Sequence, residues 1–171
     1  MQNKRGISQA FASRQDPVLE IRPAAVFDVF DVSRILTASV RDLCQADHGG
    51  DPEQIAAWTA GKSPEQIRTW IAGPGRYWLA LQGGKAAGVC GLDPEGAISL
   101  MYVSPDAANK GLGSAMLSHL EAELLRGGLR EGRLSTTRTA LGFYRAKGWQ
   151  QEAATVPGRG AHCLPMRKRF S

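Results

Sequence analysis

The residues best placed to do chemistry lie where a loop becomes a helix in the middle of the chain. Lys110 is followed by Gly111 and Gly113, and an apolar period of four begins at Leu112 and continues at Met116. Glycine has no Cβ atom, so its backbone can approach a ligand closely. The first N–H groups of a helix have no internal acceptor and lie at the positive end of its dipole. The pattern predicts a phosphate site, with Lys110 adding positive charge at its rim.

Two common phosphate-binding motifs do not fit this junction. The dinucleotide motif G-x-G-x-x-G needs a third glycine where Met116 stands, and the nucleotide P-loop needs G-K-[ST]. The stretch V-S-P-D-A-A-N-K-G-L-G-S-A-M-L, residues 103–117, instead resembles the acyl-CoA-binding motif of the GNAT family of N-acetyltransferases, [RQ]-x-x-G-x-[GA]. Ala108 stands where that family has Arg or Gln and offers an amide but no side chain. We expect this departure to affect the affinity for CoA and not the fold.

A second stretch resembles the same family. Residues 140–149 read A-L-G-F-Y-R-A-K-G-W, similar to the family's A-x-x-F-Y-x-x-x-G-F, with Trp149 in place of the last Phe. The two motifs occur in the family's order and separation, which makes the resemblance specific. It covers roughly residues 18–170.

The resemblance implies the acyl-CoA N-acyltransferase fold, an α/β (α+β) fold whose mixed, mostly antiparallel central sheet is flanked by helices. In that fold the fourth strand is bulged and splays from the fifth, which opens a slot for the pantetheine arm. Acetyl-CoA is the implied co-substrate, with no metal. Its implied contacts are Met101, Tyr102 and Val103 along the strand, and Asn109, Lys110, Gly111, Leu112, Gly113 and Ser114 around the pyrophosphate.

Acetyl transfer to an amine needs a held thioester, a polarised carbonyl, a neutral amine and a proton for the leaving thiolate. Backbone N–H groups can polarise the carbonyl, as in an oxyanion hole. The resemblance assigns the proton to Tyr144, as general acid beside the CoA sulfur. A phenol with a pKa near 10 can do this only when it lies next to the thiolate. The alternative for Tyr144 is a core aromatic with a satisfied hydroxyl.

The general base is less defined. The family's Glu in the fourth strand falls at Ala97, and Glu95 precedes it by two residues, on the same side of an extended strand. Glu95 would act through a chain of water, or it is a solvated strand end. His48 has a suitable pKa, and His162 is a third candidate, although its place on a closing strand favours a structural role.

The remaining pattern supplies the elements that position these residues. Strands are predicted over residues 18–22, 77–81, 86–92, 97–103, 133–137 and 161–168, and Gly83-Gly84 predicts a tight hairpin. Helices are predicted over residues 25–44, 51–58, 63–70 and 111–126. Asp51 and Ser63 are predicted N-caps, each followed by proline.

The composition fits one soluble domain over residues 18–171, preceded by a disordered extension over residues 1–17 that lacks the apolar segment of a signal peptide. No apolar run reaches the roughly 18 residues that a membrane span needs. Three widely spaced cysteines, without a C-x-x-C pair, indicate free thiols in a reducing cytoplasm. We therefore expect a cytoplasmic protein without a metal site.

Charge and aromatic residues leave the partners open. Residues 121–171 carry a net charge of +6, which could face nucleic acid, the CoA phosphates or solvent, with nucleic acid ranked last. Trp58 and Trp70 either anchor their helices to the core or line an acceptor pocket. The acidic residues that hint at a cationic acceptor are Asp42, Asp47 and Asp51. The leading function is acetyl transfer to an amine of a small molecule or peptide, the alternative is a non-catalytic CoA-binding module, and either could be a homodimer.

Overall fold

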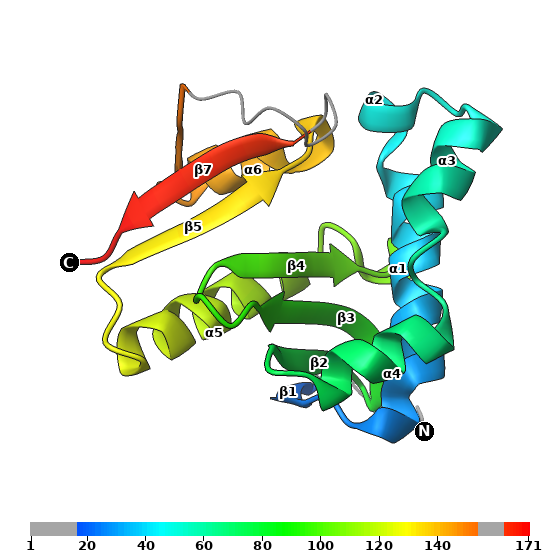
Figure 1. Ribbon diagram of the computed structural model, residues 1–171, viewed down its shortest axis with the longest axis horizontal. Helices are drawn as coiled ribbons and strands as arrows, with labels where there is room; N and C mark the ends of the chain where they lie inside the picture. The colour runs from blue at the N-terminus through cyan, green and yellow to red at the C-terminus, as the bar shows by residue number, and fades with distance from the viewer. Residues whose placement is uncertain (1–16, 154–162) are drawn as a thin grey trace, which may run out of the picture.

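The computed structural model describes residues 17–153 and 163–171 and contains a seven-stranded sheet (Figure 1). The strand order is β1-β2-β3-β4-β5-β7-β6. The β4–β5 pair is parallel and the other described neighbours are antiparallel, as expected for a mixed, mostly antiparallel sheet. The strands are β1 Leu19–Pro23, β2 Arg76–Gln82, β3 Lys85–Leu92, β4 Ile98–Val103, β5 Glu131–Thr136, β6 Gln150–Gln151 and β7 Leu164–Arg169.

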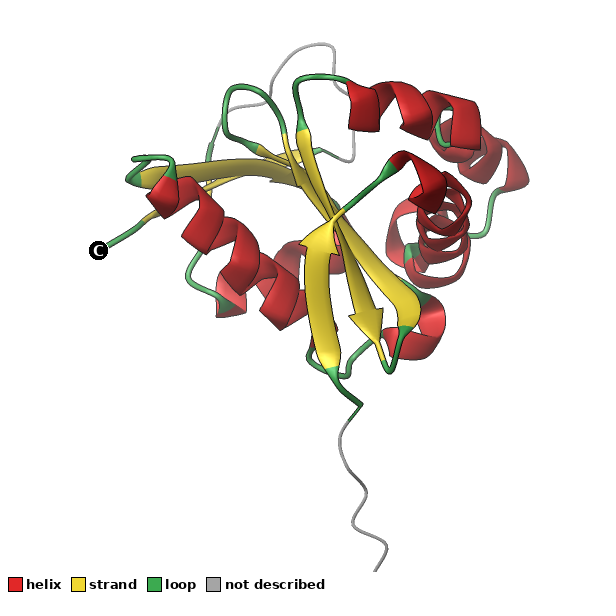
Figure 2. Cartoon of the chain, turned by 90° about the horizontal axis from the view of Figure 1, so that it is seen from below, coloured by secondary structure: helices red, strands yellow, loops and turns green. Residues whose placement is uncertain are grey.

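Helices cover the sheet from both sides (Figure 2). One core joins α1 and α4 to β2, β3 and β4, and the other joins α5 and α6 to the opposite face and to β5 and β7. The helices are α1 Val29–Leu43, α2 Gln45–His48, α3 Pro52–Thr59, α4 Pro64–Ala72, α5 Leu112–Arg126 and α6 Arg138–Ala146, with short 3₁₀ turns η1 Val26–Asp28 and η2 Pro105–Ala107.

The predicted apolar face of α5 lies in the core. Leu112, Met116, Leu120 and Leu124 are at most 2% exposed. The helix packs so closely on β3 that a Cβ atom at Gly88 would lie 2.8 Å from the sulfur of Met116. The missing side chain at Gly88 therefore lets α5 pack closely on β3, the strand next to the one expected to hold the pantetheine arm.

Local signals are confirmed at most element ends. Gly83 and Gly84 both have positive φ, as a tight two-residue hairpin requires. Asp51 accepts a hydrogen bond from the N–H of Glu53, and Ser63 accepts one from the N–H of Gln66. The closing strand begins at Leu164, and the His162 candidate lies outside the described residues.

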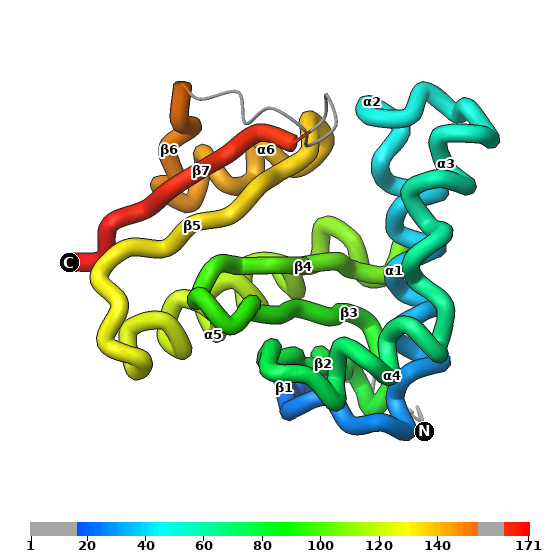
Figure 3. Tube along the Cα trace, in the orientation of Figure 1, coloured from blue at the N-terminus to red at the C-terminus, as the bar shows by residue number. Residues whose placement is uncertain are grey.

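The parallel pair is short, and β4 and β5 then part (Figures 1 and 3). Their register has one partnered position, Ile98 opposite Leu134. On its other edge β4 contains a bulge, because Gly91 is opposite Leu100 while Leu92 is opposite Ile98, which leaves Ser99 as the extra residue. The bulge and splay expected of the family fold are both present.

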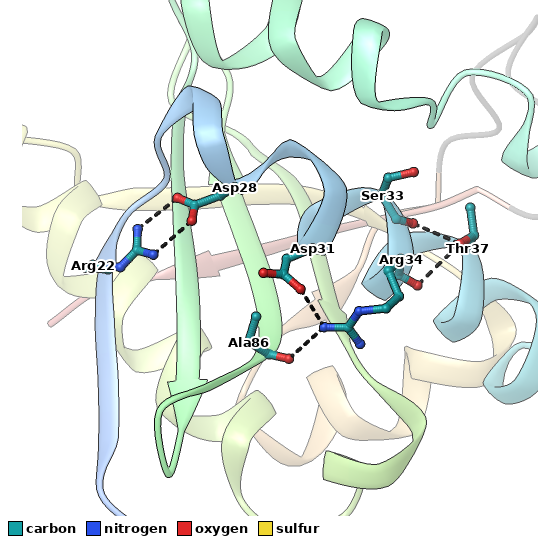
Figure 4. Close-up of polar contacts among 7 residues, drawn as sticks. All are labelled: Arg22, Asp28, Asp31, Ser33, Arg34, Thr37 and Ala86. Carbon is teal, nitrogen blue, oxygen red and sulfur yellow. Dashed lines mark hydrogen bonds and ion pairs between the residues drawn. The ribbon is translucent and has the colours of Figure 1, made fainter.

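An ion pair between Arg22 and the buried Asp28 ties β1 to the start of α1 (Figure 4). The carboxylate of Asp28 accepts hydrogen bonds from both terminal nitrogens of Arg22, at 2.8 and 2.9 Å, and from the N–H of Ala25, at 2.7 Å. The hydrogen bonds from Arg22 hold the pKa of Asp28 below its usual value, although burial opposes them. Arg34 adds a second tie by donating to Asp31 and to the carbonyl of Ala86 on β3.

We expect Asp28→Ala to lower the free energy of unfolding by about 2 kcal/mol, because it removes charge-assisted hydrogen bonds and leaves Arg22 unpaired. Because the folded-state pKa of Asp28 is depressed, its contribution is present above the unfolded-state pKa of about 3.9 and is lost as pH falls through the folded-state value. Urea unfolding between pH 3 and 7 measures both effects. Asp42→Ala, which breaks the exposed pair with Arg41, is the control and should change stability little.

Candidate functional site

The candidate site is centred where the backbones of β4 and β5 part after Ile98 and Leu134, and this parting of the two strands is called the cleft below. Beyond Ile98, the residues of β4 pair with β3 on one side only, with Met101 opposite Cys90 and Tyr102 opposite Val89. Main-chain groups on the other edge of this segment therefore face the cleft. The side chains of Met101 and Val103 pack toward α5, and that of Tyr102 packs toward α1.

The loop before α5 presents a run of main-chain donors. Within the described residues, no backbone or side-chain acceptor is found for the N–H groups from Asn109 to Ser114. Asn109 and Gly111 have positive φ, 58° and 83°, so the loop turns in the left-handed region just before the helix begins. Residues other than glycine, such as Asn109, rarely adopt this strained backbone conformation. Where they do, the residue is often part of an active site or a ligand-binding site. This backbone can bind an anion.

The N-terminus of α5 differs from the N-termini of α3, α4 and α6 in having no side-chain cap. The N-termini of α3 and α4 each have a side-chain cap and an acidic residue in the first turn. The N-terminus of α6 is capped by Thr137 and Asp47. By comparison, the N-cap of α5 is Gly111, so the helix has no capping side chain, and its first turn has no acidic residue. An uncapped positive helix end fits a negatively charged ligand.

Lys110 and Ala108, at the rim of the loop before α5, offer different groups to a ligand. The Nζ atom of Lys110 donates to the carbonyl of Asp106 at 2.6 Å, which holds its charge beside the loop. Ala108 offers no polar side chain, and its N–H donates to the carbonyl of Pro105 at 3.3 Å. The 3₁₀ turn uses this donor internally, so the free run starts one residue later.

Tyr144 lies on α6, on the α5 side of the cleft. Its ring is 6% exposed and makes edge contacts with Phe143 and Trp149. Burial is the main cause that raises the pKa of Tyr144, and the nearby Tyr102 and Cys90 raise it further. The phenol therefore keeps its proton at neutral pH, as a general acid must. The described residues include no hydrogen-bond acceptor for its hydroxyl.

The position of α6 is fixed from two sides. A Cβ atom on Gly113 would lie 3.6 Å from the ring of Phe143, so α6 packs against the first turn of α5. Across the cleft, buried Asp47 of α2 accepts hydrogen bonds from the N–H groups of Arg138 and Thr139, at 2.8 and 3.0 Å. These contacts hold Tyr144 at a fixed place relative to the glycine loop.

The acidic residues that hinted at a cationic acceptor have structural roles. Asp47 caps α6, and Asp51 caps α3. Asp42 pairs with its neighbour Arg41 on the surface. No acidic acceptor pocket is formed by these three carboxylates.

His48 is also occupied structurally. Its Nδ1 atom accepts from the N–H of Gly50 at 2.9 Å, so Nε2 carries the proton and donates to the carbonyl of Val40 at 2.8 Å. The imidazole is 2% exposed. Because its one lone pair is used, His48 has no free site to accept a proton from a substrate in this arrangement.

Glu95 is not on a strand, contrary to our expectation. It is exposed in the turn that joins β3 to β4, where Asp93 accepts hydrogen bonds from the N–H groups of Gly96 and Ala97. Strand β4 begins later, at Ile98. Glu95 and the glycine loop thus lie at opposite ends of a six-residue strand. Its role as general base stays a prediction.

The sequence left the role of Trp58 open, and the structure brings it to the cleft. A hydrogen bond between Trp58 and the Tyr102 hydroxyl partly offsets the burial that raises the pKa of Tyr102. Trp58 of α3 therefore lies beside Tyr102 of β4. Trp70 packs against the α1 core, as the core interpretation predicts. Nothing in the residue types separates these two tryptophans, because both end similar short helices.

Two absences hold for residues 17–153 and 163–171. No three His, Cys, Asp or Glu side chains gather there in a group that could hold a metal ion. The helices of the same residues include none with the length and apolar character to cross a membrane.

Comparison with known proteins identifies the family. The fold is similar to a GCN5-related N-acetyltransferase from Rhodopseudomonas palustris, with 22% identity, TM-score 0.77, and coverage of 91% of this chain and 97% of the other. It is also similar to PaiA N-acetyltransferase from Thermoplasma acidophilum in complex with coenzyme A, with 19% identity, TM-score 0.75, and coverage of 90% and 99%. No curated protein matches the chain in sequence. The acetyltransferase (GNAT) domain model matches residues 46–170, so the chain belongs to the GNAT acetyltransferase family.

Proposed function

We propose that the protein transfers the acetyl group of acetyl-CoA directly to an amine of a small molecule or peptide. The observation that carries this proposal is the run of free N–H groups from Asn109 to Ser114 at an uncapped helix end, beside the cleft. Family membership and the coenzyme A complex of the Thermoplasma protein support it.

In this proposal the loop binds the pyrophosphate, and Lys110 adds positive charge at the rim. The pantetheine arm lies along the free edge of β4, beside Met101, Tyr102 and Val103. A main-chain N–H of this edge polarises the acetyl carbonyl. The neutral amine attacks the carbonyl carbon and the C–N bond forms. The C–S bond breaks, and Tyr144 gives its proton to the leaving sulfur. The attacking nitrogen loses one proton to water, with Glu95 as the candidate base behind that water, and the Tyr144 phenolate takes a proton back from solvent.

A second candidate is a non-catalytic CoA-binding module with the same fold. The observations that favour it are Ala97 at the family's Glu position, Glu95 in a distant turn, and the internal hydrogen bond of Ala108. Both candidates require CoA binding at the glycine loop, and only the first requires Tyr144.

The variant Ser114→Asp tests the loop, because it should stabilise the free protein and weaken its binding of acetyl-CoA. A carboxylate in the first turn of α5 should stabilise the free protein slightly, by about 0.3–1 kcal/mol, because it complements the helix dipole. The same charge should repel the pyrophosphate. Acetyl-CoA at a hundred times its Kd adds about 2.7 kcal/mol, which raises the unfolding midpoint of the wild type by about 5–10 °C. We expect this rise to fall by at least about half in the variant.

The control is Ser118→Asp, which adds the same charge on the exposed side of α5 one turn later. It should keep most of the acetyl-CoA shift. No shift in the wild type at millimolar acetyl-CoA would contradict both candidate functions.

Tyr144→Phe should lower the rate of thiol release from acetyl-CoA by about a hundredfold once an acceptor is found, because the leaving thiolate loses its acid. The acetyl-CoA shift in unfolding midpoint should stay, since only a hydroxyl is removed. Tyr77→Phe, on β2, is the matched control. Full turnover by Tyr144→Phe would show that Tyr144 only packs in the core and does not act as the general acid.

Glu95→Gln tests the remaining base. If Glu95 takes the amine proton through water, the variant should lose about tenfold or more in kcat at neutral pH, with recovery at higher pH as more of the amine is neutral. The measurement is the pH profile of kcat/KM. Identical profiles for variant and wild type would remove Glu95 from the mechanism.

A further inference from the structure

One face of the C-terminal half of the sheet has none of the described helices packed on it. The α6 helix lies behind β5 and β7, and no described helix lies in front of them (Figure 1). Buried residues such as Leu134 and Met166 point toward α5 and α6. Because side chains alternate along a strand, their neighbours point the other way. The neighbours include Arg133, Arg167 and Arg169, here called the arginine face, whose side chains are 71%, 45% and 82% exposed.

The arginine face contains an unfavourable pair of like charges. Arg133 and Arg167 are directly opposite each other in the β5–β7 register, and Gln150 of β6 is opposite Arg167 on the other side. Like charges at opposed positions destabilise a sheet. A sequence that keeps such a pair breaks a local rule, and such breaks are expected at functional surfaces.

The three arginines use only some of their hydrogen-bond donors within the described residues. Glu131 contacts the Nε atoms of Arg133 and Arg169, at 3.1 and 3.6 Å, and Glu152 lies 3.8 Å from Nε of Arg167. Within the described residues, the terminal nitrogens of these three guanidinium groups make no hydrogen bond. A guanidinium presents five donors and pairs best with a carboxylate through two of them. The face therefore retains donors for further carboxylates.

The surface is hollowed beside these side chains. A depression of about 320 Å³ is lined by Gly148, Gln150, Arg167, Lys168 and Arg169. It lies where the two-residue β6 strand leaves the edge of β7 open. A carboxylate side chain of a bound polypeptide fits this combination of shape and charge.

The arginine face also adjoins the cleft. Arg133 immediately precedes Leu134, the position at which β5 still pairs with β4 before the two strands part. An extended polypeptide whose amino group lies in the cleft and whose chain follows β5 therefore passes Arg133 and the opposed Arg167.

We propose that the acceptor is an acidic polypeptide whose amino group enters the cleft and whose nearby carboxylates bind the arginine face. The proposal rests on the acetyl-transfer function above and names its substrate class. A cationic acceptor such as a polyamine would be repelled by this surface.

Binding can be measured without catalysis. Two fluorescent peptides share a free N-terminal serine and differ in having three glutamates or three glutamines at the next positions. Fluorescence anisotropy with saturating CoA gives their affinities at low and at high salt. We expect the glutamate peptide to bind about tenfold more tightly at low salt and to lose most of this advantage at high salt.

The variant Arg133→Gln/Arg167→Gln should reduce the affinity for the glutamate peptide about fivefold and leave the glutamine peptide unchanged. The control Arg68→Gln/Lys85→Gln removes the same charge from exposed positions on α4 and β3 and should keep the preference. Acetyl-CoA shifts in unfolding midpoint confirm that both variants fold.

Equal binding of the two peptides by the wild type would overturn the proposal, as would equal losses in both double variants. Tighter binding of a single-stranded oligonucleotide at the arginine face would overturn it in favour of nucleic acid. Arginine-dependent binding of the glutamate peptide without acetylation of its serine would support the docking surface and contradict acetyl transfer, so the two failures are distinguishable.

Discussion

The parting of β4 from β5 after a single partnered position is the constraint on which the rest of the structure depends. A sheet that opens in its middle loses hydrogen bonds and needs other contacts to hold its halves together. The apolar face of α5 provides one connection, since it packs against residues of β3, β4 and β5 in one core. The carboxylate of Asp47 provides another by joining α2 to the first turn of α6.

The same contacts explain why Asp47 and His48, although they lie near the cleft, are unsuited to catalysis. Asp47 and His48 are buried, and their acceptor atoms already bind main-chain N–H groups. Buried polar groups are costly unless they are paired, so these residues stabilise the scaffold. What remains open to a ligand is main chain: the free edge of β4 and the uncapped end of α5. The cleft is therefore suited to a co-substrate recognised through phosphate and amide groups.

Charged side chains have different roles in the N-terminal half of the chain and in the C-terminal part of the sheet. In the N-terminal half, Asp47 and Asp51 cap helices and Asp28 pairs with Arg22, whereas the C-terminal sheet holds three arginines around two glutamates. The arginine face lies on the side of the sheet opposite α5, away from the loop proposed for the pyrophosphate. Two anionic groups could then bind at once, CoA from the α5 side and an acidic polypeptide from the open side.

The sequence by itself determined the fold class, the capped ends of α3 and α4, the apolar face of α5 and the glycine loop, because each depends on residues close together in the chain. It could not show that Asp47 caps a helix some ninety residues later, or that Trp58 reaches Tyr102, because such contacts follow from packing between distant segments. It also misplaced Glu95, because a hairpin turn and an extended strand end share similar residues. Only the tertiary structure decided which polar side chains are consumed by folding and which remain free, since burial and pairing are properties of the assembled chain.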